Sequence, residues 1–361
     1  MDRIRLTERQ SRKYVSGLFQ HMGCSPAQAE IIADHLTCAE MRGLASHGLS
    51  RIPFYIRKLR NGGYNPTPNF SVLKETLSTA LVDADDGIGL VSGSFAMQMC
   101  IEKARSTGCA AVSVTHANHI GYLGYYSMMA AREDMIGLTI CNAGASTAVW
   151  GTTQPVLGTD PLAIAVPTMD RPMLVFDAAT SVVAQGKVAV AQIEGRPIPG
   201  HWAFDQHGQP TTDASEALRG SMRPFGDYKG SGLAIMIALI TAGLGDVAFD
   251  MEEDNLRRIL DDSAGSDLAD LFVAIDISAF VDADRFKRRA DQLIDRIKAF
   301  APAPGFEEIL MPGEIEHRKY QAAQAEGFTI DDKLRTLLER VNSSEGFSYD
   351  TNAWPIDGQQ I

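Results

Sequence analysis

Residues 79–115 read TALVDADDGIGLVSGSFAMQMCIEKARSTGCAAVSVT, and this stretch decides the fold class. The runs at 79–82 and 110–115 are short and β-like, as is typical of buried strands. Between them, residues 93–106 have apolar side chains at helical spacing. A strand, a helix and a second strand in succession predict an α/β protein.

The same alternation continues on the C-terminal side of this stretch. Further β-like runs lie at 136–141 and 163–167, and a helical pattern covers 123–132. We therefore expect a sheet whose strands are separated by helices.

The regions on either side are predicted to be helical. One N-terminal helix begins at Ser25-Pro26-Ala27-Gln28, a capping box with proline in the first helical position. Charge-rich patterns at 251–262 and 283–299 predict solvated helix faces. A last helix is expected to begin near residue 330 and to reach about residue 341. Residues 343–361 lack periodicity, so we expect a loosely held tail.

Composition and charge narrow the class of protein. The 361 residues are 45% hydrophobic and 22% charged, which is typical of a soluble globular chain. The net charge of −12, with no long Lys/Arg stripe, argues against a nucleic-acid partner. No apolar run reaches about 18 residues, so no membrane span is expected. The N-terminus has no apolar signal segment. The five cysteines are widely spaced, so we expect them to be free thiols in a reducing cytoplasm.

The glycine-rich segment 87–92, GIGLVS, is a near miss to the Rossmann dinucleotide fingerprint. Its third glycine is replaced by Ser92, and no acidic residue ends the strand-like run that follows. Asp83, Asp85 and Asp86 would repel a pyrophosphate beside this loop. No GxxxxGK[ST] segment occurs either, so neither a Rossmann nor a P-loop nucleotide site is predicted.

Ser46-His47-Gly48, followed by Arg51, is the strongest candidate for catalysis. Small neighbours allow the His47 imidazole to meet a ligand, and on a helix Arg51 would share its face. Such a pair could hold a carboxylate and move a proton beside it. A surface dipeptide remains the plain alternative. His119 is a second candidate because it follows the strand-like run 110–115, where α/β folds gather ligand groups.

Two further segments have the chemistry of anion or ribose sites. Lys229 and Gly230 lie in a glycine-rich loop before an apolar helix and suit a phosphate, although a plain turn fits equally. Asp177 and the hydroxyls of Thr180 and Ser181 suit a ribose or a simple helix cap. Trp150 is expected to be a core residue.

Taken together, seven motifs in one order resemble the malate/L-lactate dehydrogenase family of NAD(P)-dependent oxidoreductases, over about residues 5–335. In chain order they are Ser46-His47-Gly48 with Arg51; Asn118-His119-Ile120-Gly121 with Gly124-Tyr125-Tyr126; Gly158-Thr159-Asp160-Pro161-Leu162-Ala163; Asp177 to Ser181 with Gly186-Lys187; Ile198-Pro199 with Trp202-Ala203; residues 226–233; and Pro312-Gly313-Glu314. The resemblance implies a non-Rossmann α/β fold with a mostly antiparallel central sheet flanked by helices. It also implies N-terminal helices that pack near the C-terminal ones, and a homodimer.

The resemblance implies roles for individual residues. His47 would give a proton to the substrate carbonyl, His119 would belong to the same site, and Arg51, supported by Ser46, would clamp the substrate carboxylate. The cofactor, NAD or NADP, would contact Asp177, Ala179, Thr180, Ser181, Lys229, Gly230, Pro312, Gly313 and Glu314. The family usually has asparagine where this chain has Asp160. That aspartate either turns the chain before Pro161 or loses a donated hydrogen bond.

These implications define the expected organisation and function. We expect a helical domain of residues 1–72 and about 305–341, an α/β domain of 73–117 and about 233–304, and a binding domain of 118–232.

The expected reaction interconverts a small 2-hydroxy acid and its 2-oxo acid without a metal. Reduction of a cyclic imine carboxylate or oxidation of ureidoglycolate are alternatives on the same scaffold. A histidine-dependent hydrolase or lyase is the alternative from another class, but neither GxSxG nor HExxH occurs.

Overall fold

The computed structural model describes residues 3–351 and residue 354. Its helices are α1 (Glu8–His21), α2 (Pro26–Met41), α3 (Ile52–Arg60), α4 (Gly89–Thr107), α5 (Gly124–Ala131), α6 (Gln185–Glu194), α7 (Ala214–Arg219), α8 (Tyr228–Gly245), α9 (Glu253–Leu260), α10 (Ala283–Lys298), α11 (Glu314–Glu326) and α12 (Asp332–Glu345). Its strands are β1 (Arg3–Leu6), β2 (Ser71–Glu75), β3 (Thr79–Asp83), β4 (Cys109–Ala117), β5 (Met135–Cys141), β6 (Leu162–Val166), β7 (Leu174–Ala178), β8 (Ala203–Phe204), β9 (Ser221–Met222), β10 (Leu268–Asp276) and β11 (Phe328–Asp331). Short 3-10 turns are η1 (Ala45–His47), η2 (Leu49–Arg51) and η3 (Ile277–Ala279).

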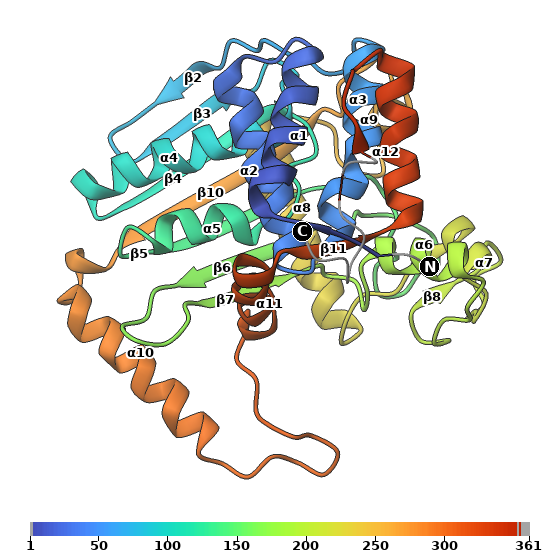
Figure 1. Ribbon diagram of the computed structural model, residues 1–361. Coiled ribbons are helices and arrows are strands. Elements are labelled where there is room, and N and C mark those ends of the chain that lie inside the picture. Colours follow the sequence, from blue (N-terminus) through green and yellow to red (C-terminus); the bar gives the residue numbers. More distant parts are fainter. Residues whose placement is uncertain (1–2, 352–353, 355–361) are drawn as a thin grey trace.

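A central sheet of seven strands, in the order β2-β3-β4-β10-β5-β6-β7, organises the molecule (Figure 1). Only the β3–β4 pair is parallel, and the other neighbours in this sheet run antiparallel. The α/β prediction and the mostly antiparallel sheet are therefore confirmed. The four β-like runs of the sequence are strands β3, β4, β5 and β6.

The local sequence does not predict β10, although this strand lies between β4 and β5 near the centre of the sheet. Aspartates at positions 270 and 276 interrupt its apolar run. Asp270 is nevertheless buried at 1% exposure, and Phe272 and Ala274 are fully buried. Tertiary packing on both faces of the sheet, rather than a local pattern, specifies this strand.

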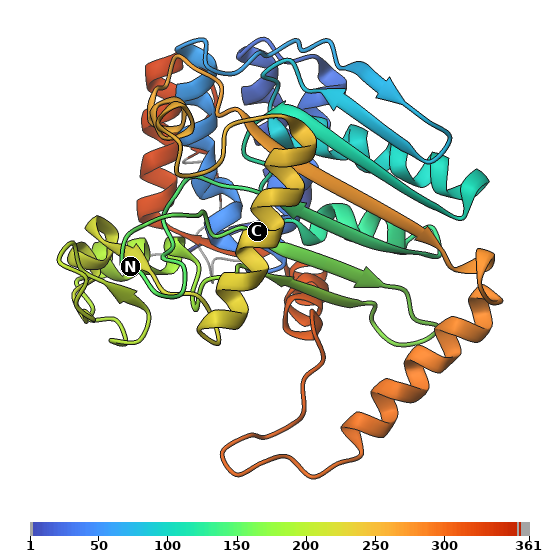
Figure 2. The ribbon, with the colours of Figure 1, turned by 180° about the vertical axis from the view of Figure 1, so that it is seen from behind.

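Helices cover both faces of the sheet. Helices α4 and α5 pack on one face, and α8 packs against β4, β5 and β10 on the other, as Figure 2 shows from behind. By length and composition, α8 is also apolar enough to cross a membrane, which the sequence analysis did not anticipate. The side of α8 that packs on the sheet resembles a core helix, because Ile237, Ala238 and Ala242 are buried.

The N-terminal helices share a hydrophobic core with the C-terminal segments. Strand β1 pairs with β11, and α12 contacts α3. The expected loose tail is corrected for its described part, because Phe347, Tyr349 and Trp354 pack around the ring of Tyr14. Residues 352–353 and 355–361 of that tail lie outside the described residues.

Residues 182–223 form a small lobe that contains α6, β8, α7 and β9. It has its own hydrophobic cluster, which includes Val188, Ile198 and Ala217. Its two ends meet at one place, where Val182 N donates a hydrogen bond to Arg223 O at 2.7 Å. We call this point the neck. Strand β9 is also joined to the body by hydrogen bonds from Met222 N to Ser146 O at 2.8 Å and from Ser221 Oγ to Thr153 O at 2.7 Å.

Helix α10 and the loop that follows it extend away from the body as an arm (Figures 1 and 2). Exposed apolar side chains along the arm are Phe280, Leu293, Phe300, Phe306 and Leu310. The charge-rich helix predicted at 283–299 is therefore present as α10, but the arm also presents apolar groups to the surface.

Candidate active site

The Ser-His-Gly stretch lies in two short 3-10 turns, with η1 ending at His47 and η2 beginning at Leu49. Glu40 of α2 fixes this geometry, because its Oε1 accepts a hydrogen bond from Leu49 N at 2.8 Å. A Cβ atom at Gly48 would lie 2.5 Å from the same oxygen. Close packing therefore requires glycine at position 48. The expectation that His47 and Arg51 share one helix face is wrong, since Gly48 interrupts the helix.

Two histidines meet beside this turn. The rings of His47 and His119 lie 5.9 Å apart and nearly parallel, at 18°. His47 Nδ1 is within hydrogen-bonding distance of Ser46 Oγ, at 2.9 Å, and His119 Nδ1 is 2.7 Å from the Tyr55 hydroxyl. With both Nδ1 atoms engaged, Nε2 is the nitrogen of each ring that can exchange a proton with a ligand.

The electrostatics of this pair favour neutral rings. Burial, and then the charge of Arg51, lowers the pKa of His47 to about 4. Burial, and then the charges of Arg51 and His47, lower the pKa of His119. Arg51 Nε donates to the carbonyl of Ser46 at 2.7 Å, and its two terminal nitrogens have no partner among the described residues. At neutral pH the site therefore holds two neutral imidazoles beside one cation.

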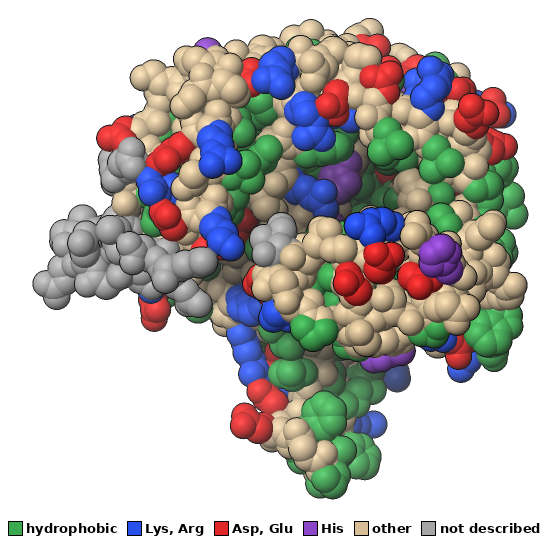
Figure 3. Space-filling model, turned by 90° about the vertical axis from the view of Figure 1, so that its right-hand side faces the viewer, with side chains coloured by type: hydrophobic (Ala, Val, Ile, Leu, Met, Phe, Trp, Pro, Cys, Tyr) green, Lys and Arg blue, Asp and Glu red, His purple; other side chains and the backbone are tan. Residues whose placement is uncertain are grey.

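A cavity of about 490 Å³ opens next to His47. We call it the main cavity. Its lining residues are Arg42, Leu44, Ser46, His47, Gly121, Tyr122, Leu123, Gly124, Thr159, Pro161, Val175, Phe176, Asp177, Ala178, Ala179, Ser181, Val182, Val183, Ala184, Lys187, Pro312, Gly313 and Glu316. Figure 3 shows a hollow on the face of the molecule that lies at the right in Figure 1, with a histidine and a basic side chain inside it.

The part of the main cavity around Ser46 and His47 is called here the histidine side. The N-terminus of α6 lies against it, since a Cβ atom at Gly186 would be 3.3 Å from Ser46 Cβ. Lys187, in the first turn of α6, lines this part of the cavity. Its Gly-Lys pair was quoted among the family motifs, but the sequence analysis gave it no role.

The part of the main cavity formed by Arg42, Asp177, Pro312, Gly313 and Glu316 is called here the Arg42 side. Asp177 Oδ2 accepts a hydrogen bond from Gly124 N at 2.7 Å. Burial raises the pKa of Asp177 to about 6, against the opposing effects of this hydrogen bond and the Arg42 charge. Pro312 O accepts from Val175 N at 3.0 Å, which holds the start of α11 against β7.

The structure brings part of the predicted set together. The predicted residues that line the main cavity are Ser46, His47, Asp177, Ala179, Ser181, Pro312 and Gly313. His119 and Arg51 do not line the main cavity, but His119 stacks on His47, and the charge of Arg51 acts on His47.

Other predicted residues have different surroundings. Thr180 is buried and directs both N and Oγ1 to the carbonyl of Thr159. Glu314 pairs with Lys298 and Arg318. Lys229 is exposed, and Gly230 packs on the carbonyl of Phe225, so neither lines the main cavity. Cofactor contacts from these residues stay predictions.

The sequence analysis missed Arg42 and Glu316. Arg42 ends α2 just before the Ser-His-Gly turn, and Glu316 follows Pro312-Gly313-Glu314 in the first turn of α11. Their proximity to two quoted motifs was the available signal. A charged residue at a helix end is more commonly solvated, so neither was singled out.

Asp160 is fully buried and has a positive φ of 30°. Aspartate tolerates such a turn conformation. Its pKa is raised well above the usual range, first by burial and then by the charge of Asp250. Asp250 accepts hydrogen bonds from Asn142 Nδ2 at 2.8 Å and from Gly158 N at 2.7 Å. Burial and the neighbouring charge of Asp250 thus favour the neutral form of Asp160, which can donate a hydrogen bond as an asparagine amide can.

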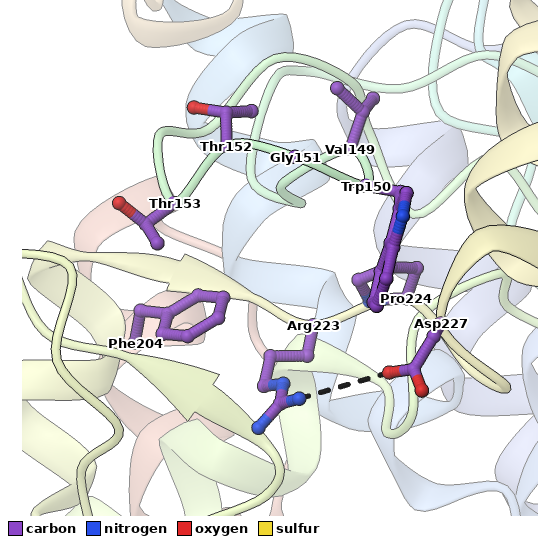
Figure 4. A pocket seen from close by; sticks show the side chains of 9 residues that line it. All are labelled: Val149, Trp150, Gly151, Thr152, Thr153, Phe204, Arg223, Pro224 and Asp227. Atoms are coloured by element: carbon purple, nitrogen blue, oxygen red, sulfur yellow. Dashed lines mark ion pairs between the residues drawn. The ribbon is translucent and has the colours of Figure 1, made fainter.

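A second, smaller cavity of about 370 Å³ contains none of the predicted site residues. Figure 4 shows Trp150 and Phe204 on opposite sides of it, with Arg223 directed toward Asp227. Trp150 is 62% exposed, so the expectation of a core tryptophan is wrong. Within residues 3–351 and 354, no cluster of three or more His, Cys, Asp or Glu side chains could hold a metal ion.

Comparison with known proteins places the chain in a family. The family model described as malate/L-lactate dehydrogenase matches residues 6–339. The L-sulfolactate dehydrogenase of Methanocaldococcus jannaschii is 38% identical over 338 residues, covering 93% of this chain and 96% of that protein. The NAD(+) ureidoglycolate dehydrogenase of Escherichia coli O157:H7 is 33% identical over 316 residues, or 88% and 89% of the two chains.

The solved structure of malate dehydrogenase from Pyrococcus horikoshii superposes with a TM-score of 0.87 and 31% identity, covering 96% of this chain and 97% of that one. Fold and site thus define an α/β protein of the dehydrogenase class. The chain belongs to the malate/L-lactate dehydrogenase family.

The main cavity has the chemistry that a nicotinamide dinucleotide requires. Such a cofactor presents both anionic phosphates and ribose hydroxyls. On the Arg42 side, the cavity offers a cation, two carboxylates and the start of helix α11. The residues present therefore fit the group.

Proposed function

We propose that this chain is an NAD(P)-dependent dehydrogenase that interconverts a small 2-hydroxy acid, of the malate, lactate or sulfolactate type, and its 2-oxo acid. One observation carries the proposal. The stacked His47–His119 pair, with Arg51 beside it, adjoins a cavity that fits a dinucleotide. The similar proteins, which include sulfolactate, malate and ureidoglycolate dehydrogenases, support the same reaction class.

The protein's part in this reaction is positioning and proton transfer. When bound, the nicotinamide supplies or accepts the hydride. Arg51 offers its two terminal nitrogens to the substrate carboxylate, which would place the hydroxyl carbon near the histidine pair. In the oxidative direction, neutral His47 Nε2 accepts the hydroxyl proton as a general base.

The reductive direction needs a protonated His47. Its low pKa in the ligand-free protein opposes this. The negative charge of a bound 2-oxo acid would neutralise Arg51, which is the second cause of the shift, and so raise the pKa of His47. Proton uptake should therefore accompany binding of the 2-oxo acid. His119, held by Tyr55, is the alternative proton donor in the same site.

The test is a screen of 2-oxo acids and cyclic imine carboxylates with NADH and with NADPH, following the loss of absorbance of the reduced cofactor. The reverse assay uses 2-hydroxy acids and ureidoglycolate. We expect turnover of at least one small 2-oxo acid, and no loss on addition of EDTA. Turnover of an imine alone would move the chain to the reductase alternative. Loss on EDTA, restored by a divalent ion, would contradict the metal-free mechanism.

The proposal includes a homodimer and a cytoplasmic location. Large apolar residues are exposed along one side of α8, among them Ile235, Met236 and Leu239, and the arm adds further ones. Exposed apolar surface of this kind is typical of protein interfaces. Light scattering on the purified protein should give twice the chain mass of 39.1 kDa. A monomer at micromolar concentration would contradict the dimer.

A further inference from the structure

His35 of α2 is a fully buried histidine that contacts the segment following His119. Its Nε2 lies 3.3 Å from the backbone N of Tyr122. A backbone N–H can only donate, so Nε2 accepts this hydrogen bond and is the unprotonated nitrogen of the ring. The proton of the neutral ring is therefore on Nδ1.

The surroundings keep the His35 ring neutral. Burial, and then the charge of His47, lowers the pKa of His35 to about 3. The rings of Tyr122, Tyr125 and Tyr126 lie against it, with centroids 4.9, 4.5 and 5.5 Å away. At neutral pH, Nε2 therefore keeps the lone pair that accepts from Tyr122 N.

Packing alone does not account for a histidine at this position. Nδ1 is buried and has no hydrogen-bond partner within the part of the chain that the structure describes. A buried donor without a partner costs free energy, and an apolar side chain of similar size, such as leucine, would remove that cost. Leucine would offer no acceptor to Tyr122 N, so the acceptor is the property that favours histidine here.

The His35 ring also packs directly on the backbone of Gly121. Gly121 has a left-handed conformation with φ of 73°, and a Cβ atom there would lie 2.2 Å from His35 Nε2. Only glycine permits so close an approach. One residue earlier, Ile120 O accepts a hydrogen bond from the Tyr126 hydroxyl at 2.6 Å. Residues 120–122 are thus held at two points, by one carbonyl and one N–H.

This short segment joins a catalytic candidate to the cavity wall. It follows His119 directly, so its position determines where the His119 ring stacks on His47. Gly121 and Tyr122 themselves line the main cavity. A displacement of about 1 Å at a reacting group can cost about a hundredfold in rate. The chemistry of the histidine pair therefore requires that residues 120–122 stay fixed.

We infer that His35 is a positioning residue for the reaction. By accepting the hydrogen bond from Tyr122 N, it fixes residues 120–122, and with them His119 and the adjoining wall of the cavity. The inference rests on the proposed function and adds a residue that does not line the cavity and acts through the backbone. A histidine that contributes only to folding is the alternative, and it is one outcome of the test.

The experiment compares His35→Leu and His35→Gln with the control His21→Leu. Leucine cannot accept from Tyr122 N, whereas the side-chain oxygen of glutamine can. His21, the last residue of α1, is exposed, and its Nε2 also bonds a backbone group, Glu345 O at 2.8 Å. Steady-state kinetics with a 2-oxo acid are measured well below the melting temperature of each protein.

For His35→Leu we expect kcat to fall about ten- to a hundredfold, because the histidine pair is displaced. KM for the oxo acid should change less than about threefold, since the Arg51 clamp is untouched. His35→Gln should recover kcat to within about threefold of wild type, because it restores the acceptor. His21→Leu should keep the wild-type kcat, even where it melts at a lower temperature.

NMR of protein with ¹⁵N-labelled histidine separates positioning from a purely structural role. The ring signals of His119 should shift in His35→Leu and stay in place in His35→Gln and His21→Leu. The wild-type His35 ring should be neutral and protonated on Nδ1. Protonation on Nε2 instead would overturn the inference without any variant.

The remaining outcomes are equally decisive. A His35→Leu protein that melts lower than wild type but keeps its kcat and its His119 signals would show that His35 is only structural. Equal losses of kcat in His35→Leu and His35→Gln would show that the acceptor does not matter, and would also overturn the inference. Both results leave the proposed function intact. Wild-type protein that reduces neither a 2-oxo acid nor an imine carboxylate would overturn the proposed function, and the inference with it.

Discussion

The histidine side and the Arg42 side of the main cavity differ in how their polar groups are satisfied. On the histidine side, Ser46, Tyr55 and a backbone carbonyl engage His47, His119 and Arg51. On the Arg42 side, neither Arg42 nor Glu316 forms an ion pair or side-chain hydrogen bond with a described residue, although both charges act on Asp177. Groups that perform chemistry need fixed geometry, whereas groups that bind a large ligand exchange water for that ligand. We therefore expect the histidine side to perform catalysis and the Arg42 side to bind a ligand.

The largest effect should come from His47→Gln. Loss of a general acid or base typically costs about two to four orders of magnitude in rate. We expect kcat to fall by this amount while the dissociation constant for NADH stays within about twofold, because His47 belongs to the histidine side. Steady-state kinetics and NADH titration check both values. His119→Gln is the parallel variant, and a His47→Gln enzyme that keeps more than about a third of kcat would transfer the role to His119.

Arg51→Lys should have the next largest effect. Lysine cannot reproduce two parallel hydrogen bonds to a carboxylate, so kcat/KM for the 2-oxo acid should fall about ten- to a hundredfold. The NADH dissociation constant should not change. Because Arg51 Nε also donates to Ser46 O, the melting temperature is measured on the same variant. A destabilised protein with an unaltered KM would show that Arg51 is structural.

Asp177→Asn tests the Arg42 side through pH. Above its pKa of about 6, Asp177 is ionised and can only accept hydrogen bonds; below it, the carboxyl becomes neutral and a weaker acceptor. Wild-type affinity for ADP-ribose should therefore weaken, by up to about tenfold, as pH falls through 6. Asp177→Asn should show a smaller pH dependence in the same calorimetric titration. Identical pH profiles for the two proteins would remove Asp177 from the cofactor site.

The smallest effect is expected from Asp160→Asn, beneath the cavity wall. The folded state raises the pKa of Asp160 above its unfolded value near 3.9, so the folded protein binds the proton more tightly. The contribution of Asp160 to the free energy of unfolding is therefore fully present below pH 4, and it is lost as pH rises toward the pKa of Asp160 in the folded state. Asparagine cannot ionise, so the variant should melt about 1–3 °C higher at pH 8 and show less advantage at pH 5. A variant that melts lower at both pH values would contradict this assignment.

The sequence predicts those strands, helices and turns that form from residues close together in the chain. The runs that form β3, β4, β5 and β6 alternate with well-formed helices, and the motif at His47 lies on the wall of the main cavity. The sequence does not predict strand β10 because its Asp270 becomes buried only when the sheet and α8 assemble.

The site residues that were missed share a physical reason. Arg42 and Glu316 have ordinary positions at helix ends, and only the fold brings them together with Asp177 from β7. Conversely, Lys229 was predicted because a lysine in a glycine-rich loop suits a phosphate, yet within the described chain it lies away from the main cavity. Chain motifs identify chemistry, but the cavity depends on contacts between distant segments.

The neck at Val182 and Arg223 has a consequence for protein engineering. The two ends of residues 182–223 lie next to each other and the lobe has its own hydrophobic cluster, so we expect that the whole segment can be exchanged as a cassette if its hydrogen bonds to residues 146–153 are kept. Such an exchange would replace the α6 end of the cavity wall, including Lys187, without shifting the register of the central sheet. Chimeras between family members at this junction would thus transplant substrate preference while keeping the cofactor half of each enzyme.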